Sequence, residues 1–162
     1  HFITRRQHLY KLEDRWIQSD IAHFEYYAQR GLEEKTAKLS NEWLKLAMRL
    51  VDGQFCSDIE REWIESIQAH YNEQILKILE RVAQNYVRLQ EFDKVIRWAE
   101  RIIAQDDGHE EGYRLLMLAH YYLGNRREAL KQYERCVNVL DEQYKISPMD
   151  PTEQLYELVL KM

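Results

Sequence analysis

The sequence is poor in the residues that interrupt regular structure: its 162 residues include 5 glycines and 2 prolines. Strand-rich folds need many tight turns, and such turns draw on glycine and proline. The scarcity of both therefore favours long helices over many short strands. Cysteine is equally scarce, and Cys56 and Cys136 form no CxxC pair, so no disulfide framework is expected. Each cysteine is expected to be a small buried side chain.

The chain also lacks an excess of positive charge, with a formal net charge of -5 and a pI of about 5.7. This balance argues against a domain that grips a nucleic-acid backbone by itself. A local basic run near the N-terminus, partly offset by acidic residues, is expected to be a solvated terminal segment: Arg5, Arg6, Lys11 and Arg15. No apolar run is long enough to span a bilayer and no signal peptide is visible, which predicts no membrane partner and a cytoplasmic location.

What the chain does have is apolar residues at helical spacing from residue 19 onward. Ser19 or Asp20 is expected to cap a first helix that Gly31 ends. A second helix is expected over 36–51. Its apolar face is expected to contain Leu39, Trp43, Leu46, Ala47 and Leu50. Residues 1–18 lack this periodicity, which predicts an extended or hairpin-like arm.

Two further helix starts are visible downstream. The sequence "SDIE" at 57–60 is a capping box, and it predicts one uninterrupted helix over 58–89. Near the C-terminus, Asp150 is expected to be the N-cap of a last helix with Pro151 at its first position.

Between these helices the chain repeats itself at an offset of 34 residues. The segments that begin at Ile78 and Gly112 each show a helix, a short turn and a second helix, and this period is that of the tetratricopeptide repeat. Gly124 suits the turn of the second unit, where the first unit has Gln90. Two units bury too little surface alone. We therefore expect an all-α, tetratricopeptide-like, right-handed stack of antiparallel helix pairs, with about seven helices.

Catalytic and cofactor-binding motifs are not found. The sequence has no phosphate-binding loop, no GxGxxG and no HExxH, and His109-Glu110-Glu111 lacks the second histidine that a zinc site needs. We therefore predict no enzyme activity, no catalytic residues, no metal and no cofactor. Protein binding is a better hypothesis, because the first helices of tetratricopeptide units line a concave surface. The candidate interaction residues there are Gln84, Arg88, Arg114, Leu118, Tyr121 and Tyr122. Alternatively, Tyr121 or Tyr122 packs against the last helix.

Several motifs in order resemble the bacterial transcriptional activator domain. Asp20 and Phe24 match the helix start of that family, and "LAMRLVDGQF" at 46–55 is similar to its "AL-x-LY-x-G-x-(F/L)L" segment. The segment 110–148 resembles the pattern "E…R-LM…G-r-x-x-AL-x-x-Y-x-r…L…LG-(V/I)-x-P". Its matches are Glu110 or Glu111, Arg114, Leu116, Met117, Gly124, Arg126, Ala129, Leu130, Tyr133, Arg135, Leu140, Ile146 and Pro148. Tyr144-Lys145 stands where the family often has Leu-Gly.

The resemblance implies a non-catalytic regulatory and protein-interaction domain over 19–162, as in SARP-type regulators. Such domains usually follow a winged-helix or response-regulator-type DNA-binding domain, and 1–18 is expected to be a linker or remnant of it. DNA would then be contacted only through that domain, with RNA polymerase or a second protomer as further candidate partners. The alternative is a generic tetratricopeptide adaptor that binds a peptide or partner protein. An enzyme or ligand-sensing module ranks last.

Overall fold

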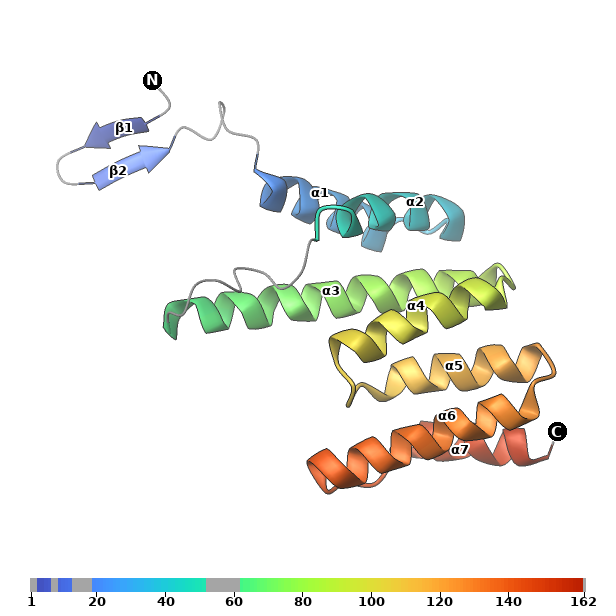
Figure 1. The fold of residues 1–162 in the computed structure, drawn as a ribbon. Coiled ribbons are helices and arrows are strands. Elements are labelled where there is room, and N and C mark those ends of the chain that lie inside the picture. Colours follow the sequence, from blue (N-terminus) through green and yellow to red (C-terminus); the bar gives the residue numbers. More distant parts are fainter. Residues whose placement is uncertain (1–2, 7–8, 13–18, 52–61, 162) are drawn as a thin grey trace.

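The computed structural model describes residues 3–6, 9–12, 19–51 and 62–161. Strands β1 (Ile3–Arg6) and β2 (Leu9–Leu12) form an antiparallel hairpin. The helices follow in the order α1 (Asp20–Glu33), α2 (Ala37–Met48), α3 (Glu62–Arg88), α4 (Phe92–Gln105), α5 (Glu110–Tyr122), α6 (Arg126–Val139), the short π-helix η2 (Leu140–Tyr144) and α7 (Asp150–Leu160). The expected helical stack behind a hairpin-like arm is confirmed (Figure 1).

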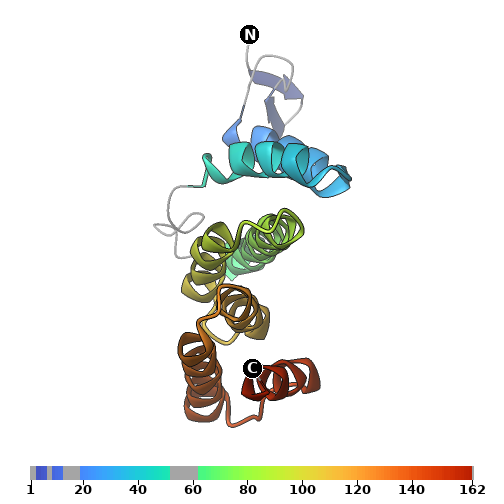
Figure 2. The ribbon, with the colours of Figure 1, turned by 90° about the vertical axis from the view of Figure 1, so that its right-hand side faces the viewer.

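Successive helices run antiparallel and pack in pairs, α1 on α2, α3 on α4 and α5 on α6. The pairs join through α2 on α3 and α4 on α5, and α7 closes the series against α5 and α6. Figure 2 shows the resulting layers, with α1 and α2 at one end and α6 and α7 at the other. In the part of the chain that the structure describes, the hairpin contacts none of the helices.

The two repeat units bury equivalent positions. Leu79 and Tyr113, which are 34 residues apart, are 2% and 0% exposed. Other equivalent pairs are fully buried: Val82 and Leu116, Val95 and Ala129, Ile102 and Cys136. Not every equivalent pair shares its burial: of Ala99 and Tyr133, only the alanine is fully buried. The 34-residue period is thus a period of burial, as expected when each helix pair packs on the next.

The turns of the two units are built alike although their sequences differ. Gln90 has a φ of 57° and Gly124 a φ of 75°, so both adopt the left-handed conformation. The next amide in each turn, of Glu91 or Asn125, donates to a carbonyl near the end of the preceding helix, at 3.0 and 2.8 Å. This is the arrangement that ends many helices, and it normally favours glycine. Gln90 therefore adopts a backbone conformation that glycine adopts more easily.

The first helix pair departs from the sequence-based expectations at Gly31. Ser19 does cap α1, since its hydroxyl accepts from the amide of Ala22 at 3.1 Å. Gly31, however, does not end the helix, which continues to Glu33. It is buried at the crossing with α2, where an added Cβ would lie 2.4 Å from Leu44 Cδ2. The glycine is needed for close approach rather than for a turn.

The predicted apolar face of α2 is wrong in all but one position. The buried residues of this helix are Ser40, Asn41, Leu44, Ala47 and Met48. The polar residues Ser40 and Asn41 can be buried there because they are hydrogen-bonded. Ser40 Oγ donates to the carbonyl of Gly31 at 2.6 Å. The side-chain amide of Asn85 on α3 donates to Ser40 Oγ and to Asn41 Oδ1. The uninterrupted α3 is confirmed, while the capping box at 57–60 lies outside the described residues.

Candidate functional site

A groove of about 590 Å³ opens between α3, the start of α5 and the segment that precedes α7. Its lining residues are Glu80, Gln84, Asp106, Gly108, His109, Glu110, Glu111, Arg114, Leu140, Ile146, Ser147 and Met149. The first helices of both repeat units thus contribute to it, as expected for a tetratricopeptide-like stack. Ile146 and Met149 give it an apolar rim, since they are 55% and 52% exposed.

Glu110 lies at the wall of this groove and is only 5% exposed. Its carboxylate accepts from the backbone amide of Met149 at 3.0 and 3.2 Å and from the hydroxyl of Thr152 at 2.6 Å. Met149 is the N-cap of α7, and Glu110 accepts from its backbone amide as the glutamate of a capping box does, but from another helix. The prediction that Asp150 caps this helix is therefore wrong; Asp150 is already its first residue.

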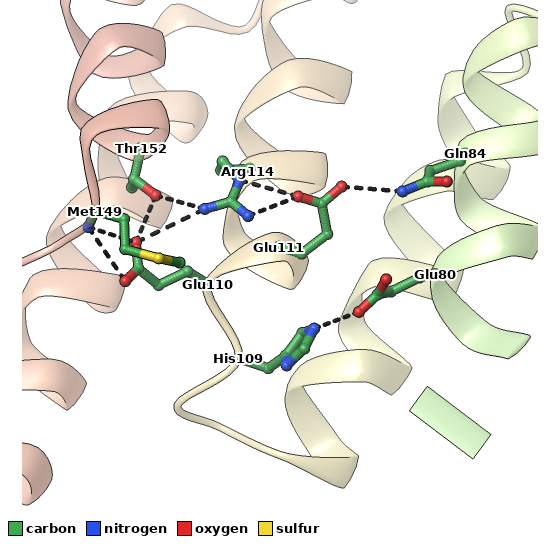
Figure 3. Close-up of polar contacts among 8 residues, drawn as sticks. All are labelled: Glu80, Gln84, His109, Glu110, Glu111, Arg114, Met149 and Thr152. Carbon is green, nitrogen blue, oxygen red and sulfur yellow. Dashed lines mark hydrogen bonds and ion pairs between the residues drawn. The ribbon is translucent and has the colours of Figure 1, made fainter. Parts of the chain in front are cut away.

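Arg114 extends this polar contact across the groove (Figure 3). Its guanidinium donates to Thr152 Oγ1 at 3.0 Å and lies 3.8 Å from Glu110. It also contacts the Glu111 carboxylate at 2.8 and 2.9 Å. The Gln84 amide on α3 donates to the other oxygen of Glu111 at 3.3 Å. A continuous line of polar contacts therefore joins α3, α5 and α7.

A second contact between repeats lies at the α4–α5 turn. His109, the N-cap residue of α5, hydrogen-bonds Glu80 of α3 through Nε2. Its Nδ1 lies 3.9 Å from Asp106. The hydrogen bond to Glu80 raises the pKa of His109 above its usual value, burial opposes that rise, and the surrounding carboxylates add to it. The imidazolium form is favoured because acidic groups surround it.

The lining of the groove is predominantly acidic. Four carboxylates face one arginine and one histidine, namely Glu80, Asp106, Glu110 and Glu111 against Arg114 and His109. Arg114 is already engaged by Glu111 and Thr152, and His109 by Glu80, so among the described lining residues no cation is left to receive an added anion. Such a surface suits a neutral or cationic partner group better than a phosphate.

The six predicted interaction residues have different surroundings in the folded chain. Gln84 and Arg114 line the groove and meet on Glu111. Arg88 lies one turn further along α3 and is exposed, while Leu118 on α5 is half-buried. Tyr121 packs with the cluster that contains Val159 of α7, which is the alternative considered for it. Tyr122 is 59% exposed, with its ring stacked on Phe92 at 4.7 Å.

The sequence-based reasoning missed Glu110, Thr152 and the His109–Glu80 contact. Glu110 and Thr152 are 42 residues apart, and neither lies in a motif that links them. Only their burial in the folded chain identifies them. Across residues 19–51 and 62–161, no group of three or more histidine, cysteine or acidic side chains is arranged to hold a metal ion. Among those same residues, no helix has the length and apolar character needed to cross a membrane.

Comparison with known proteins agrees with the fold. No curated protein matches the sequence. Among solved structures, Mycobacterium tuberculosis EmbR in complex with a low-affinity phosphopeptide is similar in fold, with a TM-score of 0.84 at 19% identity. The match covers 99% of this chain and 43% of that EmbR chain, so this chain spans less than half of its length. The profile of the bacterial transcriptional activator domain matches residues 19–160. The chain belongs to the bacterial transcriptional activator domain family.

Proposed function

We propose that this chain is the regulatory and protein-interaction domain of a bacterial SARP-like transcriptional regulator, and that it acts without catalysis. In this proposal a winged-helix or response-regulator-type domain precedes α1 and reads the DNA, and residues 1–18 are its remnant and linker. The helical stack binds a protein partner, such as RNA polymerase, and so sets the output of the DNA-bound regulator. The protein works in the cytoplasm.

The observation that carries this proposal is the continuous series of polar contacts that crosses the groove and joins α3, α5 and α7. Gln84, Glu111 and Arg114 join α3 to the two residues that hold the start of α7, Glu110 and Thr152. A partner that enters the groove must compete for these hydrogen bonds. Because both walls are tied through the same side chains, binding is coupled to the position of α7. Regulation needs such a coupling between a contact surface and a second part of the protein.

The same lining indicates the chemistry of the partner. Four carboxylates against one arginine and one histidine favour a segment that carries lysine or arginine, with an apolar side chain against Ile146 and Met149. The solved EmbR structure is a complex with a phosphopeptide, and a phosphate group carries charge of the opposite sign to lysine and arginine. We therefore expect phosphopeptides not to bind in this groove.

Alanine variants in the full-length regulator test the proposal. Arg88 and Tyr122 are exposed, so R88A is expected to leave the fold intact and Y122A to remove only the stacking of the Tyr122 ring on Phe92. Both, together with Q84A at the groove, are expected to lower transcription from the target promoter while promoter affinity stays unchanged. R97A, an exposed arginine on α4 away from the α3–α5 face, is the matched control and is expected to keep full activity. Full transcription in all three variants contradicts the assigned surface.

A further inference from the structure

The four carboxylates of the groove differ in what already holds them. Glu110 accepts hydrogen bonds from the start of α7, and Glu111 is paired with the Arg114 guanidinium at 2.8 Å. Glu80 and Asp106 have no such partner, since the structure pairs neither of them with a lysine or an arginine among the residues that it describes. These two carboxylates are therefore the least occupied ones that a cationic partner meets in the groove.

His109 is the side chain that reaches both of these carboxylates. Its Nε2 hydrogen-bonds Glu80 of α3 (Figure 3), and its Nδ1 lies 3.9 Å from Asp106. Although His109 is the N-cap residue of α5, its side chain makes no capping hydrogen bond to that helix. The His109 and Glu80 side chains are 29% and 27% exposed, so a partner in the groove can reach the contact. The ring therefore acts as the counterion of Glu80 rather than as a helix cap.

The charge of the groove depends on the proton that His109 holds. The charged groups in the lining around this ring are acidic apart from one arginine: Glu80, Asp106, Glu110, Glu111 and Arg114. The segment that precedes α7 lines the groove with uncharged residues: Ile146, Ser147 and Met149. The hydrogen bond to Glu80 raises the pKa of His109, burial opposes this rise, and the negative charges of Glu80, Asp106 and Glu111 add to it. When His109 loses its proton, the groove becomes more negative and Glu80 loses its counterion.

We propose that His109 competes with the partner for Glu80: a lysine or arginine side chain of the partner displaces the ring, His109 releases its proton, and binding in the groove strengthens as the pH rises. This rests on the proposed function, in which the partner carries such a side chain. Glu80 is the preferred receptor because only the contact with His109 has to be given up there. At Glu111 the partner would have to displace both Arg114 and Gln84.

The direction of the pH effect follows from this exchange of cations. In the free groove, Glu80 favours the imidazolium form of His109. In the complex, the partner's cation takes that carboxylate and adds a like charge beside the ring, so the imidazolium form is disfavoured. Binding therefore releases a proton to the solvent, and the association constant rises with pH as long as His109 is protonated in the free groove. The release of one proton corresponds to a rise of at most about tenfold per pH unit.

Calorimetric titration of the full-length regulator with the peptide acetyl-KLKLK-amide tests this at pH about 6 and about 8, across the range in which histidines titrate. The peptide is expected to bind several-fold more tightly at the higher pH, while acetyl-ELELE-amide is expected not to bind. The variant H109Q keeps an amide that can donate to Glu80 but does not titrate, so its affinity for the cationic peptide is expected to be the same at both pH values. H70Q, at an exposed histidine of α3 outside the groove, is the matched control and is expected to keep the pH dependence.

A measurement on the unmodified chain keeps the test independent of the variants. In carbon NMR of the regulator with labelled histidine rings, addition of acetyl-KLKLK-amide is expected to lower the titration midpoint of His109. An unchanged midpoint, an affinity that does not vary with pH, the same pH dependence in H109Q, or no binding of this peptide overturns the proposal. Transcription reports on the proposed function separately. Full transcription in Q84A, R88A and Y122A contradicts that function and leaves the proton-coupled contact standing.

Discussion

Glu110 of α5 caps α7 from a distance, with its two carboxylate oxygens 3.0 and 3.2 Å from the backbone amide of Met149. The two residues are 39 positions apart in the sequence. A carboxylate suits the positive end of a helix dipole, and here it accepts from the backbone amide of the N-cap residue, as the glutamate of a capping box does. The start of α7 is therefore held by the helix that also forms the wall of the groove.

Removing this carboxylate is expected to loosen α7. E110A leaves the Met149 amide and the buried Thr152 hydroxyl without their acceptor, which is expected to lower the free energy of unfolding by about 2 kcal/mol. Amide hydrogen exchange in α7 is expected to accelerate more than that in α3. E157A, at an exposed position on α7 itself, is the control and is expected to change neither quantity. Equal stability of E110A and E157A contradicts the distant cap.

The two repeat turns predict substitutions of opposite sign. Q90G removes the strain of a left-handed glutamine and is expected to raise the free energy of unfolding by about 0.5–1 kcal/mol. G124A places a methyl where no atom lies within 4 Å, so the expected loss of about 1 kcal/mol comes from backbone conformation alone. Denaturant titration of both variants measures these changes. The same sign for both contradicts the equivalence of the turns.

Lys145 is a third left-handed residue, with a φ of 57° after η2. The resemblance to the family places Lys145 where glycine is often found, and a left-handed backbone is a conformation that glycine adopts more easily than lysine. K145G is accordingly expected to stabilise the chain by about 0.5–1 kcal/mol in the same titration. K161G, at a lysine with a helical backbone and a φ of -82°, is the matched control and is expected to give no gain.

The contact between His109 and Glu80 predicts a pH dependence with a definite sign. The hydrogen bond raises the pKa of His109 in the folded state, so the folded chain binds more protons than the unfolded chain above pH ~6.5. The stabilising contribution is complete below that pH and is lost as the pH rises through the folded-state pKa. In E80Q this decline is expected to shrink, whereas E65Q, an exposed control on α3, is expected to keep it. Denaturant unfolding at several pH values measures the slopes, and identical slopes for wild type and E80Q contradict the assignment.

Cys136 tests the repeat core through its reactivity. Burial raises the pKa of this thiol to about 12, and its side chain is fully buried at the position equivalent to Ile102. In a C56S background it is expected to resist a thiol reagent in native buffer and to react fully in denaturant. Rapid labelling under native conditions would show that the second repeat does not bury this position.

Sequence periodicity predicted the central part of the fold because the same interactions occur twice. Leu79 and Tyr113 occupy equivalent buried positions, so a 34-residue pattern identified both. The same reasoning failed for α2, where the apolar stripe at Leu39 and Trp43 faces outward and hydrogen-bonded Ser40 lies inside. Periodicity shows which residues share a helix face but cannot show which face meets a neighbour.

The candidate site was predictable only in part, for a related reason. Gln84 and Arg114 were predicted because a tetratricopeptide-like stack places its first helices on one surface, and both do line the groove. Glu110 and Thr152 join segments that are distant in sequence and take their roles from long-range hydrogen bonds. Helix-capping patterns involve residues that are close in sequence, so they predicted Asp150 as the cap of α7. The carboxylate that contacts the start of this helix comes instead from Glu110 of α5.

The central claim is that this chain regulates a DNA-bound protein and does not itself bind DNA. Promoter affinity, measured by fluorescence anisotropy at several salt concentrations, tests it most directly on the 162-residue chain and on the full-length protein. The full-length protein is expected to bind tightly, with affinity that falls steeply with salt, while the acidic 162-residue chain shows no binding. Equal promoter affinity of both proteins, or none for the full-length protein, would contradict the account.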